Sequence, residues 1–316
     1  MYLDPINASF AAAIADVPGP EKLGYVGARE ALEVLQKHVP ASDIATETIQ
    51  VSGKCGQTSV TISRSKSLAT KQLPMVFYTH GGGWILGSPA SFAPLVEDLA
   101  RRTGTAIVFP CYTPAPDKQF PFQFEQTYEV LDYMVRNGSS HGLATQSIAF
   151  AGDSVGGHMA IALMNLSLER SLPAAVTHIV LFYPVTDTHQ KLESYETFKD
   201  GPFLTEDSMD WMINAFLPNK EDRKTALASP LTFLPDDVLA KFAPTTVVLS
   251  TVDPLLDEGL AFGQRLQKAG VDASVIRAEG QMHAFVLLKA LRETPTARAM
   301  MDLCALRLRS ALFPSA

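Results

Sequence analysis

Residues 150–157 read Phe-Ala-Gly-Asp-Ser-Val-Gly-Gly and place Ser154 between two glycines, where an apolar run gives way to a helical pattern. Residues 147–151 resemble a buried strand, and apolar residues then recur at helical spacing up to residue 168. A Gly-x-Ser-x-Gly turn between a strand and a helix exposes the serine oxygen at the carboxyl edge of a sheet, where a Cβ in place of either glycine would clash. Because a chain of this length contains the motif by chance in roughly one case in ten, Ser154 is predicted as a nucleophile only if partner residues are also present.

The segments around this turn alternate between short apolar runs and helical patterns. This alternation implies right-handed crossovers and a mostly parallel sheet, so the fold class is α/β. Two earlier segments alternate polar and apolar residues with a period of two, which predicts an antiparallel pair of strands ahead of the parallel part. The predicted strands are 47–51, 58–63, 75–79, 106–109, 147–151, 179–183, 246–250 and 273–276.

Two parts of the chain lack strand patterns and are expected to lie over the sheet. The first 45 residues contain helical stretches at 10–14 and 28–38, with Pro18, Gly19 and Pro20 as breakers between them. After Asp187 the strand–helix rhythm stops until about residue 242, and this insertion carries an apolar helix. Its apolar face either packs on the domain or lines a substrate pocket. The candidate pocket residues are Trp84, Phe203, Met209, Trp211 and Met212.

Three polar residues follow three different predicted strands: Ser154, Asp253 and His283. In a parallel sheet the carboxyl ends of all strands lie on one edge, so these side chains are predicted to converge. A serine hydroxyl needs a general base, and that base needs an orienting acid. The chain order Ser, Asp, His is the order found in α/β-hydrolases.

The other candidates for base and acid fit less well. His80 opens a glycine loop and is expected to brace it by hydrogen bonding, and His158 lies one turn beyond Ser154 on the same helix, where we expect a structural role. The remaining four histidines lie away from strand ends. Asp257 and Glu258 begin a helix, where acidic residues offset the helix dipole. Asp253 is preferred because it follows its strand directly.

A tetrahedral intermediate needs donors for its oxyanion. Residues 80–83, His-Gly-Gly-Gly, follow a predicted strand, and glycines let backbone N–H groups turn into a site. We predict an oxyanion hole made of the N–H groups of Gly81, Gly82 and Val155. A flexible linker and a phosphate-binding loop are the alternatives, but the second lacks a Gly-Lys-Ser/Thr ending.

Six motifs spread over most of the chain resemble those of the hormone-sensitive-lipase-like α/β-hydrolases. They lie at residues 80–84, 112–117, 152–157, 183–187, 253–255 and 283–285. The resemblance implies the α/β-hydrolase fold with an eight-stranded sheet, a helical cap, and hydrolysis of carboxylic esters without a metal or organic cofactor. It divides the chain into 1–45 (N-terminal part of the cap), 46–187 (core), 188–242 (cap insertion) and 243–316 (core). The chain departs from the common family pattern at Asp117, Val155, His158 and Ala284.

Composition limits the partners and the location of the protein. The 316 residues carry a net charge of −7 and contain no run of basic residues, which argues against nucleic-acid binding. No apolar stretch approaches the length that spans a membrane, and the N-terminus lacks a secretory signal pattern, so we expect a cytoplasmic protein without stable membrane insertion. The three cysteines are widely spaced and are expected to be ordinary thiols rather than disulfide partners or metal ligands.

The sequence therefore predicts a serine carboxylesterase that acts on a small-molecule ester with a short to medium acyl chain. Two other functions use the same fold. An acyltransferase or lactone hydrolase would share the triad, because an alcohol can capture the acyl-enzyme in place of water. A non-catalytic ligand receptor would be expected to lack the histidine, which this chain retains. The sequence leaves a homodimer open as an assembly state.

Overall fold

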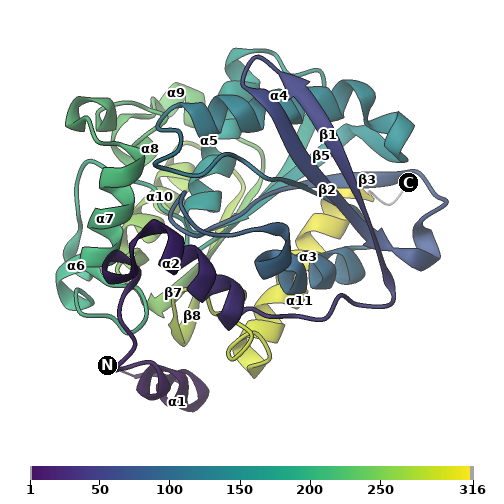
Figure 1. Ribbon diagram of the computed structural model, residues 1–316. Helices are drawn as coiled ribbons and strands as arrows, with labels where there is room; N and C mark the ends of the chain where they lie inside the picture. The colour runs from purple at the N-terminus through teal and green to yellow at the C-terminus, as the bar shows by residue number, and fades with distance from the viewer. Residues whose placement is uncertain (1, 314–316) are drawn as a thin grey trace.

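Eight strands form one central sheet in the structure, a computed structural model that describes residues 2–313 (Figure 1). The strand order is β1-β2-β4-β3-β5-β6-β7-β8. The β1–β2 and β2–β4 pairs are antiparallel and all other pairs are parallel, which confirms the predicted mostly parallel sheet with an antiparallel lead-in. The strands are β1 (Ile44–Gly53), β2 (Gly56–Ser65), β3 (Leu73–Thr79), β4 (Ala106–Pro110), β5 (Leu143–Asp153), β6 (Ala175–Phe182), β7 (Thr245–Val252) and β8 (Ala273–Met282).

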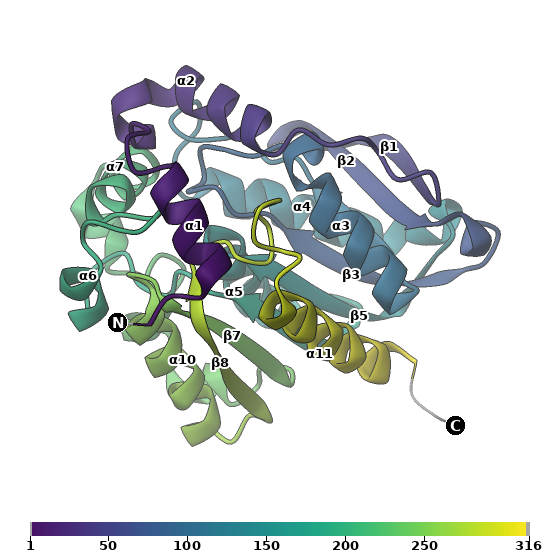
Figure 2. The same cartoon turned by 90° about the horizontal axis from the view of Figure 1, so that it is seen from below.

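Helices cover both faces of this sheet (Figure 2). Helices α3 and α11 pack on one face, and α4, α5 and α10 pack on the other. Strands covered on both faces must be apolar on both faces, and every residue of β4 and β7 is buried. The helices of these two layers are α3 (Pro89–Thr103), α4 (Phe122–Asn137), α5 (Val155–Glu169), α10 (Leu256–Lys268) and α11 (Pro295–Leu312).

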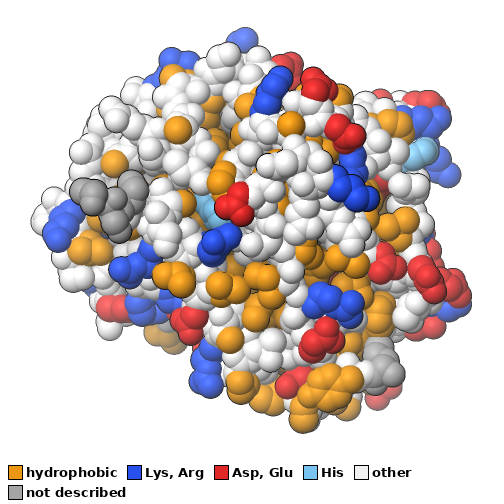
Figure 3. Space-filling model, turned by 180° about the vertical axis from the view of Figure 1, so that it is seen from behind, with side chains coloured by type: hydrophobic (Ala, Val, Ile, Leu, Met, Phe, Trp, Pro, Cys, Tyr) orange, Lys and Arg blue, Asp and Glu red, His pale blue; other side chains and the backbone are white. Residues whose placement is uncertain are grey.

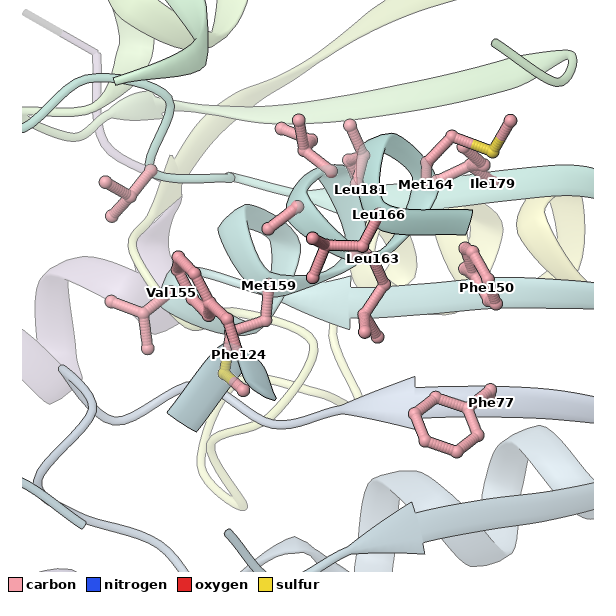
Figure 4. Close-up of a cluster of buried hydrophobic side chains, with 14 of the residues drawn as sticks. Phe77, Phe124, Phe150, Val155, Met159, Leu163, Met164, Leu166, Ile179 and Leu181 are labelled. Atoms are coloured by element: carbon pink, nitrogen blue, oxygen red, sulfur yellow. The ribbon is translucent and has the colours of Figure 1, made fainter. Parts of the chain in front are cut away.

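Helix α5 lies in the middle of the larger core cluster. Val155, Met159 and Leu163 follow one another at intervals of four residues and lie on the side of the helix near Phe77 of β3 and Phe150 of β5 (Figure 4). Most of the remaining residues of α5 are buried as well. A helix that is apolar nearly all round belongs in the interior. Its packing therefore fixes the position of Ser154, which directly precedes its first residue.

The N-terminal segment forms two helices, α1 (Pro5–Ala13) and α2 (Pro20–Leu35), and both begin earlier than predicted. The prediction treated Pro20 as a breaker. Instead, each helix starts on a proline, which is well tolerated in the first turn because its missing N–H would have no partner there. The Asp4 side chain caps α1 by accepting from the Ile6 N–H.

The insertion after Asp187 contains short helices and, within residues 188–242, no strand, as predicted. Its longest helix is capped by Thr205, which accepts a hydrogen bond from the Ser208 N–H. Tyr25 of α2 stacks on Trp211 of this helix with ring centroids 5.0 Å apart. The two parts of the chain that lack strands therefore contact each other. The helices are α6 (Glu193–Thr197), α7 (Glu206–Phe216), α8 (Pro230–Phe233) and α9 (Asp236–Leu239).

Candidate active site

Ser154 sits on a sharp turn between β5 and α5. Its backbone has φ 56° and ψ −124°, a conformation that costs a non-glycine residue on the order of 1–3 kcal/mol. Its N–H donates to the Phe182 carbonyl at 2.9 Å, and its own carbonyl accepts from the Val185 N–H at 3.1 Å. Both bonds tie the turn to β6 and the loop after it, so the surrounding structure holds the strained residue in place.

The glycines of the motif are required by close backbone approaches. A Cβ on Gly152 would collide with the carbonyl oxygen of Gly156, and one on Gly156 would collide with that of Thr79. A Cβ on Gly157 would come within 2.7 Å of the Pro184 Cβ. Gly152 therefore allows the turn to close on itself, and Gly156 and Gly157 allow it to lie directly against β3 and the loop after β6.

The structure brings the three predicted residues together. His283, directly after β8, places Nε2 3.0 Å from the Ser154 Oγ. Its Nδ1 lies 2.7 Å from an Asp253 carboxylate oxygen. A neutral imidazole in this position donates Nδ1–H to the carboxylate and accepts the serine proton at Nε2. All three side chains are at least nine-tenths buried, so bulk water does not compete for these bonds.

The competing acids bind elsewhere. Asp257 accepts a hydrogen bond from the Ser194 N–H at 2.8 Å, and Glu258 accepts one from the Thr186 N–H at 2.6 Å. Burial raises the pKa of Glu258 well above its ordinary value. Asp253 is thus the carboxylate that contacts His283, as predicted.

The two other histidines near the site have structural contacts, as expected. His80 Nδ1 lies 2.8 Å from the Gly81 carbonyl oxygen, and the ring stacks between Phe109 and Tyr112. His158 is fully buried with Nε2 2.7 Å from the Leu227 carbonyl oxygen. Burial lowers the pKa of each imidazole to about 4, so both are neutral at physiological pH.

One N–H group of the predicted oxyanion hole already has an acceptor within the protein. The Gly81 N–H donates to Oδ1 of Asp153 at 2.9 Å and is therefore occupied. The N–H groups of Gly82 and Gly83 have no acceptor anywhere in residues 2–313, and neither has that of Val155, the first residue of α5. Gly82 and Gly83 adopt φ values of 94° and 66°, a region that favours glycine. The free donors beside Ser154 are those of residues 82, 83 and 155.

Asp153 was missed by the sequence analysis. Its Oδ1 accepts from Gly81 and also from the Tyr78 hydroxyl at 2.6 Å. Complete burial raises the pKa of this carboxyl to about 6, and the two hydrogen bonds oppose part of that rise. A carboxyl group at the end of an apolar, buried strand needs hydrogen-bond donors. The position of Asp153 at the end of such a strand could therefore have indicated that it binds neighbouring donors.

The five candidate pocket residues lie in different surroundings. Met212 of α7 lies so close to Gly83 that a Cβ added to Gly83 would collide with the Met212 sulfur. Trp84 is fully buried and stacks on Phe216 at 4.3 Å. Met209 is buried, Phe203 lies 6.2 Å from the Phe10 ring, and Trp211 stacks on Tyr25 as described above. Met212 thus contacts the glycine loop, and the pocket role of all five residues stays a prediction.

The chain matches, over residues 76–287, the model of a family described by the alpha/beta hydrolase fold. This match spans all the residues of the site.

The chain belongs to the α/β-hydrolase family.

Relatives of this α/β hydrolase are named esterases. An esterase of Gibberella moniliformis is 66% identical over 99% of this chain and 98% of its own length. The crystal structure of carboxyl esterase 2 from Tuber melanosporum superposes with a TM-score of 0.90 and 32% identity over 98% of this chain and 99% of its own. An ethyl acetate hydrolase of Pseudomonas putida is 31% identical over 69% of this chain and 68% of its own.

These similarities confirm the predicted resemblance to the hormone-sensitive-lipase-like group and make this hydrolase a carboxylic ester hydrolase acting on a small-molecule ester. Two further observations concern the part of the chain that the structure describes. No group of three or more His, Cys, Asp or Glu side chains there is arranged to hold a metal ion. No helix there has both the length and the apolar character needed to cross a bilayer.

Proposed function

We propose that this esterase works by a serine mechanism, with Ser154 as the nucleophile, His283 as the general base and Asp253 as the acid that orients the imidazole. The observation that carries the proposal is the continuous set of contacts from Ser154 Oγ to His283 Nε2 and from His283 Nδ1 to Asp253. The second distance suits a charge-assisted hydrogen bond.

In the first half of the reaction, the Ser154 oxygen attacks the ester carbonyl while His283 Nε2 takes the serine proton. The carbonyl π bond opens to an oxyanion, which accepts hydrogen bonds from the N–H groups of Gly82, Gly83 and Val155. The imidazolium then gives its proton to the leaving alcohol oxygen as the carbon–oxygen bond of the ester breaks. The products are an acyl-enzyme on Ser154 and the free alcohol.

In the second half, water replaces the alcohol. His283 takes a proton from the attacking water, and a second oxyanion forms that accepts hydrogen bonds from the same N–H groups. The imidazolium then returns the proton to the Ser154 oxygen as the carboxylic acid leaves. Asp253 stabilises the imidazolium that forms in each half without becoming protonated itself.

The test is the substitution Ser154→Ala. We expect the variant to lose esterase activity by at least a thousandfold and to lose labelling by a fluorophosphonate probe, since loss of a triad nucleophile leaves only the contribution of binding and the oxyanion hole. Mass spectrometry of the labelled wild type should locate the adduct on Ser154. Labelling of another residue, or undiminished ester turnover in the variant, would refute the mechanism.

The substrate range we propose is short to medium acyl chains, with residues 1–45 and 188–242 acting as a cap over the site. Three observations support this. Ser154 and His283 are 7% and 5% exposed, Met212 of the insertion contacts the glycine loop, and a relative is named an ethyl acetate hydrolase. A narrow entrance disfavours long acyl chains because they must be desolvated and ordered in a small space.

A series of p-nitrophenyl esters measures this range. We expect kcat/KM to be highest for acetate to hexanoate and to fall for decanoate and longer chains, in solutions where every ester is monomeric. Met212→Ala should shift the optimum towards longer chains if this side chain limits the space. Faster turnover of long-chain than of butyrate-sized esters would contradict the proposal. Cytoplasmic location and a homodimer remain predictions, the latter tested by light scattering.

A further inference from the structure

Two amide side chains of the N-terminal segment are buried on either side of the His283 segment. Asn7 belongs to α1 and is 0% exposed, and Gln36 ends α2 and is 1% exposed. Neither is near Ser154 in the sequence, and the reaction described above uses neither. Burying an amide without hydrogen-bond partners is costly. The partners of Asn7 and Gln36 therefore show which part of the chain each side chain fixes.

Asn7 binds the strand end that precedes His283. Its Oδ1 accepts from the Met282 N–H at 3.0 Å, and its Nδ2 donates to the Gln281 side-chain oxygen at 3.0 Å. The backbone N–H can only donate, which fixes the orientation of the Asn7 amide. The same stretch is held once more by the Asp4 N–H, which donates to the Gly280 carbonyl at 2.9 Å.

Gln36 binds the loop that follows His283. Its Oε1 accepts from the Lys289 N–H at 3.0 Å, and its Nε2 donates to the Leu287 carbonyl at 3.0 Å. A further bond from Nε2 to the Ser91 carbonyl at 3.2 Å connects this loop to α3. The two amides therefore hold residues 281 and 282 before His283 and residues 287 and 289 after it.

This segment needs such restraint because of Ala284. The residue has φ 63°, in the left-handed region that non-glycine residues avoid. The N–H groups of Leu287 and Leu288 turn back to its carbonyl at 3.0 and 2.9 Å. A residue in a disfavoured backbone conformation persists only where its surroundings determine it, and a shift at Ala284 would move the adjacent imidazole.

We propose that Asn7 and Gln36 are positioning residues for His283: by fixing the backbone before and after it, they keep Nε2 within hydrogen-bond reach of Ser154 and Nδ1 on Asp253. The inference rests on the proposed serine mechanism and extends it to residues that never touch the substrate. A displacement of about 1 Å in a catalytic group can lower a rate on the order of a hundredfold, whereas a purely structural anchor would affect stability alone.

The variants Asn7→Leu and Gln36→Met keep the approximate length of each side chain and remove its hydrogen bonds. We expect kcat for a short-chain ester to fall on the order of tenfold to a hundredfold, with KM changed less than about threefold. The downfield proton NMR resonance of the imidazole Nδ1–H should weaken or broaden, because it depends on the contact with Asp253.

Two matched substitutions serve as controls on the same helices. Ser9→Ala changes an exposed residue of α1, and Ala28→Gly weakens the buried face of α2 while leaving the hydrogen bonds of Asn7 and Gln36 in place. We expect Ala28→Gly to lower the thermal midpoint while leaving kcat and the imidazole resonance unchanged. If Gln36→Met does not fold, Gln36→Asn, which keeps the amide but shortens its reach, replaces it with the same expected loss of kcat.

The outcomes are distinct. Variants of Asn7 and Gln36 that lose thermal stability yet keep kcat within twofold of wild type and retain the imidazole resonance would overturn the inference and leave the serine mechanism intact. Failure of the serine mechanism itself would be seen independently, as activity and probe labelling that survive Ser154→Ala. Loss of kcat together with the altered resonance, in variants that still fold, supports the positioning role.

Discussion

At the scale of single residues, Asp153 links the nucleophile turn to the glycine loop. Its folded-state pKa of about 6 lies above the unfolded value of 3.8, so its ionised form destabilises the fold. This penalty is absent below about pH 3.8 and complete above about pH 6, and it amounts to roughly 3 kcal/mol.

Asp153→Asn cannot ionise and keeps one oxygen for Tyr78 and Gly81. We expect its free energy of unfolding, relative to wild type, to rise by about 3 kcal/mol between pH 4 and pH 7, measured by urea unfolding at both values. Tyr78→Phe removes a donor that favours the carboxylate, so its stability should fall further than that of wild type as the pH rises. A difference between Asp153→Asn and wild type that is independent of pH would contradict the assigned ionisation.

The residues that could be predicted from sequence are those fixed by strand ends. Ser154, Asp253 and His283 each follow an apolar run, and a parallel sheet forces such positions to one edge. The bond between the Gly81 N–H and Asp153 could not be predicted, for a different reason. Which of three consecutive glycine N–H groups faces the site depends on φ values of the loop, and on a carboxylate from another strand that takes one of the donors. Neither is encoded in the local pattern.

At the scale of elements, α5 is joined to the insertion by His158. The Nε2 atom of His158 lies 2.7 Å from the Leu227 carbonyl oxygen, and the ring packs edge-on against Trp84 and Phe124. The folded-state pKa of about 4 lies below the unfolded value of 6.5. The unfolded chain therefore takes up this proton first, and stability is lost as the pH falls from about 6.5 towards 4.

His158→Leu tests this link. At pH 7 we expect the variant to be less stable than wild type by roughly 1–3 kcal/mol, since the Leu227 carbonyl loses its donor. At pH 5 the deficit should shrink by about 2 kcal/mol, because the variant no longer carries a histidine that must stay neutral. Thermal or urea unfolding at the two values provides the measurement. A deficit that grows on acidification would be the opposite of this expectation.

The positions of strands and helices were predicted most accurately where the element is fully buried and least accurately at the N-terminus. Strands β3 to β7 are apolar runs with both faces covered, and their existence could be predicted from that pattern. The starts of α1 and α2 could not. Pro20 was interpreted as a breaker although it occupies the first turn of α2, and the helical pattern of the first segment was recognised only from residue 10, whereas α1 begins at Pro5. A proline indicates the boundary of a helix, and the neighbouring residues determine whether the helix lies before or after it.

For the molecule as a whole, the order of strands and helices along the chain was enough to predict the fold. The charge distribution on the surface adds little information about function. On the face shown in Figure 3, acidic and basic side chains are interspersed among apolar ones without a large patch of one sign. That mixture agrees with the net charge of −7 spread over 316 residues.

Deletion of residues 1–17 tests the dependence of the whole fold on its first helix. Removing α1 leaves the Met282 N–H without its acceptor, and it leaves the Gln281 side-chain oxygen with only the Thr294 hydroxyl as a partner. Each unpaired buried group costs about 1–3 kcal/mol, so we expect a clearly lower thermal midpoint and at least a tenfold lower kcat. Differential scanning calorimetry and ester hydrolysis check this. A truncated chain with wild-type midpoint and activity would show that α1 is dispensable.

The contact between Asn7 and Gln281 joins residues 274 positions apart, and this has a consequence for the newly synthesised chain. At about 5–20 residues per second, a ribosome needs roughly 15–55 s to make the second partner after the first. Throughout that time the N-terminal helices have no completed strand β8 to dock on. Activity is therefore expected to arise only after synthesis of the last strand, so that a prematurely terminated chain is inactive even when it contains Ser154.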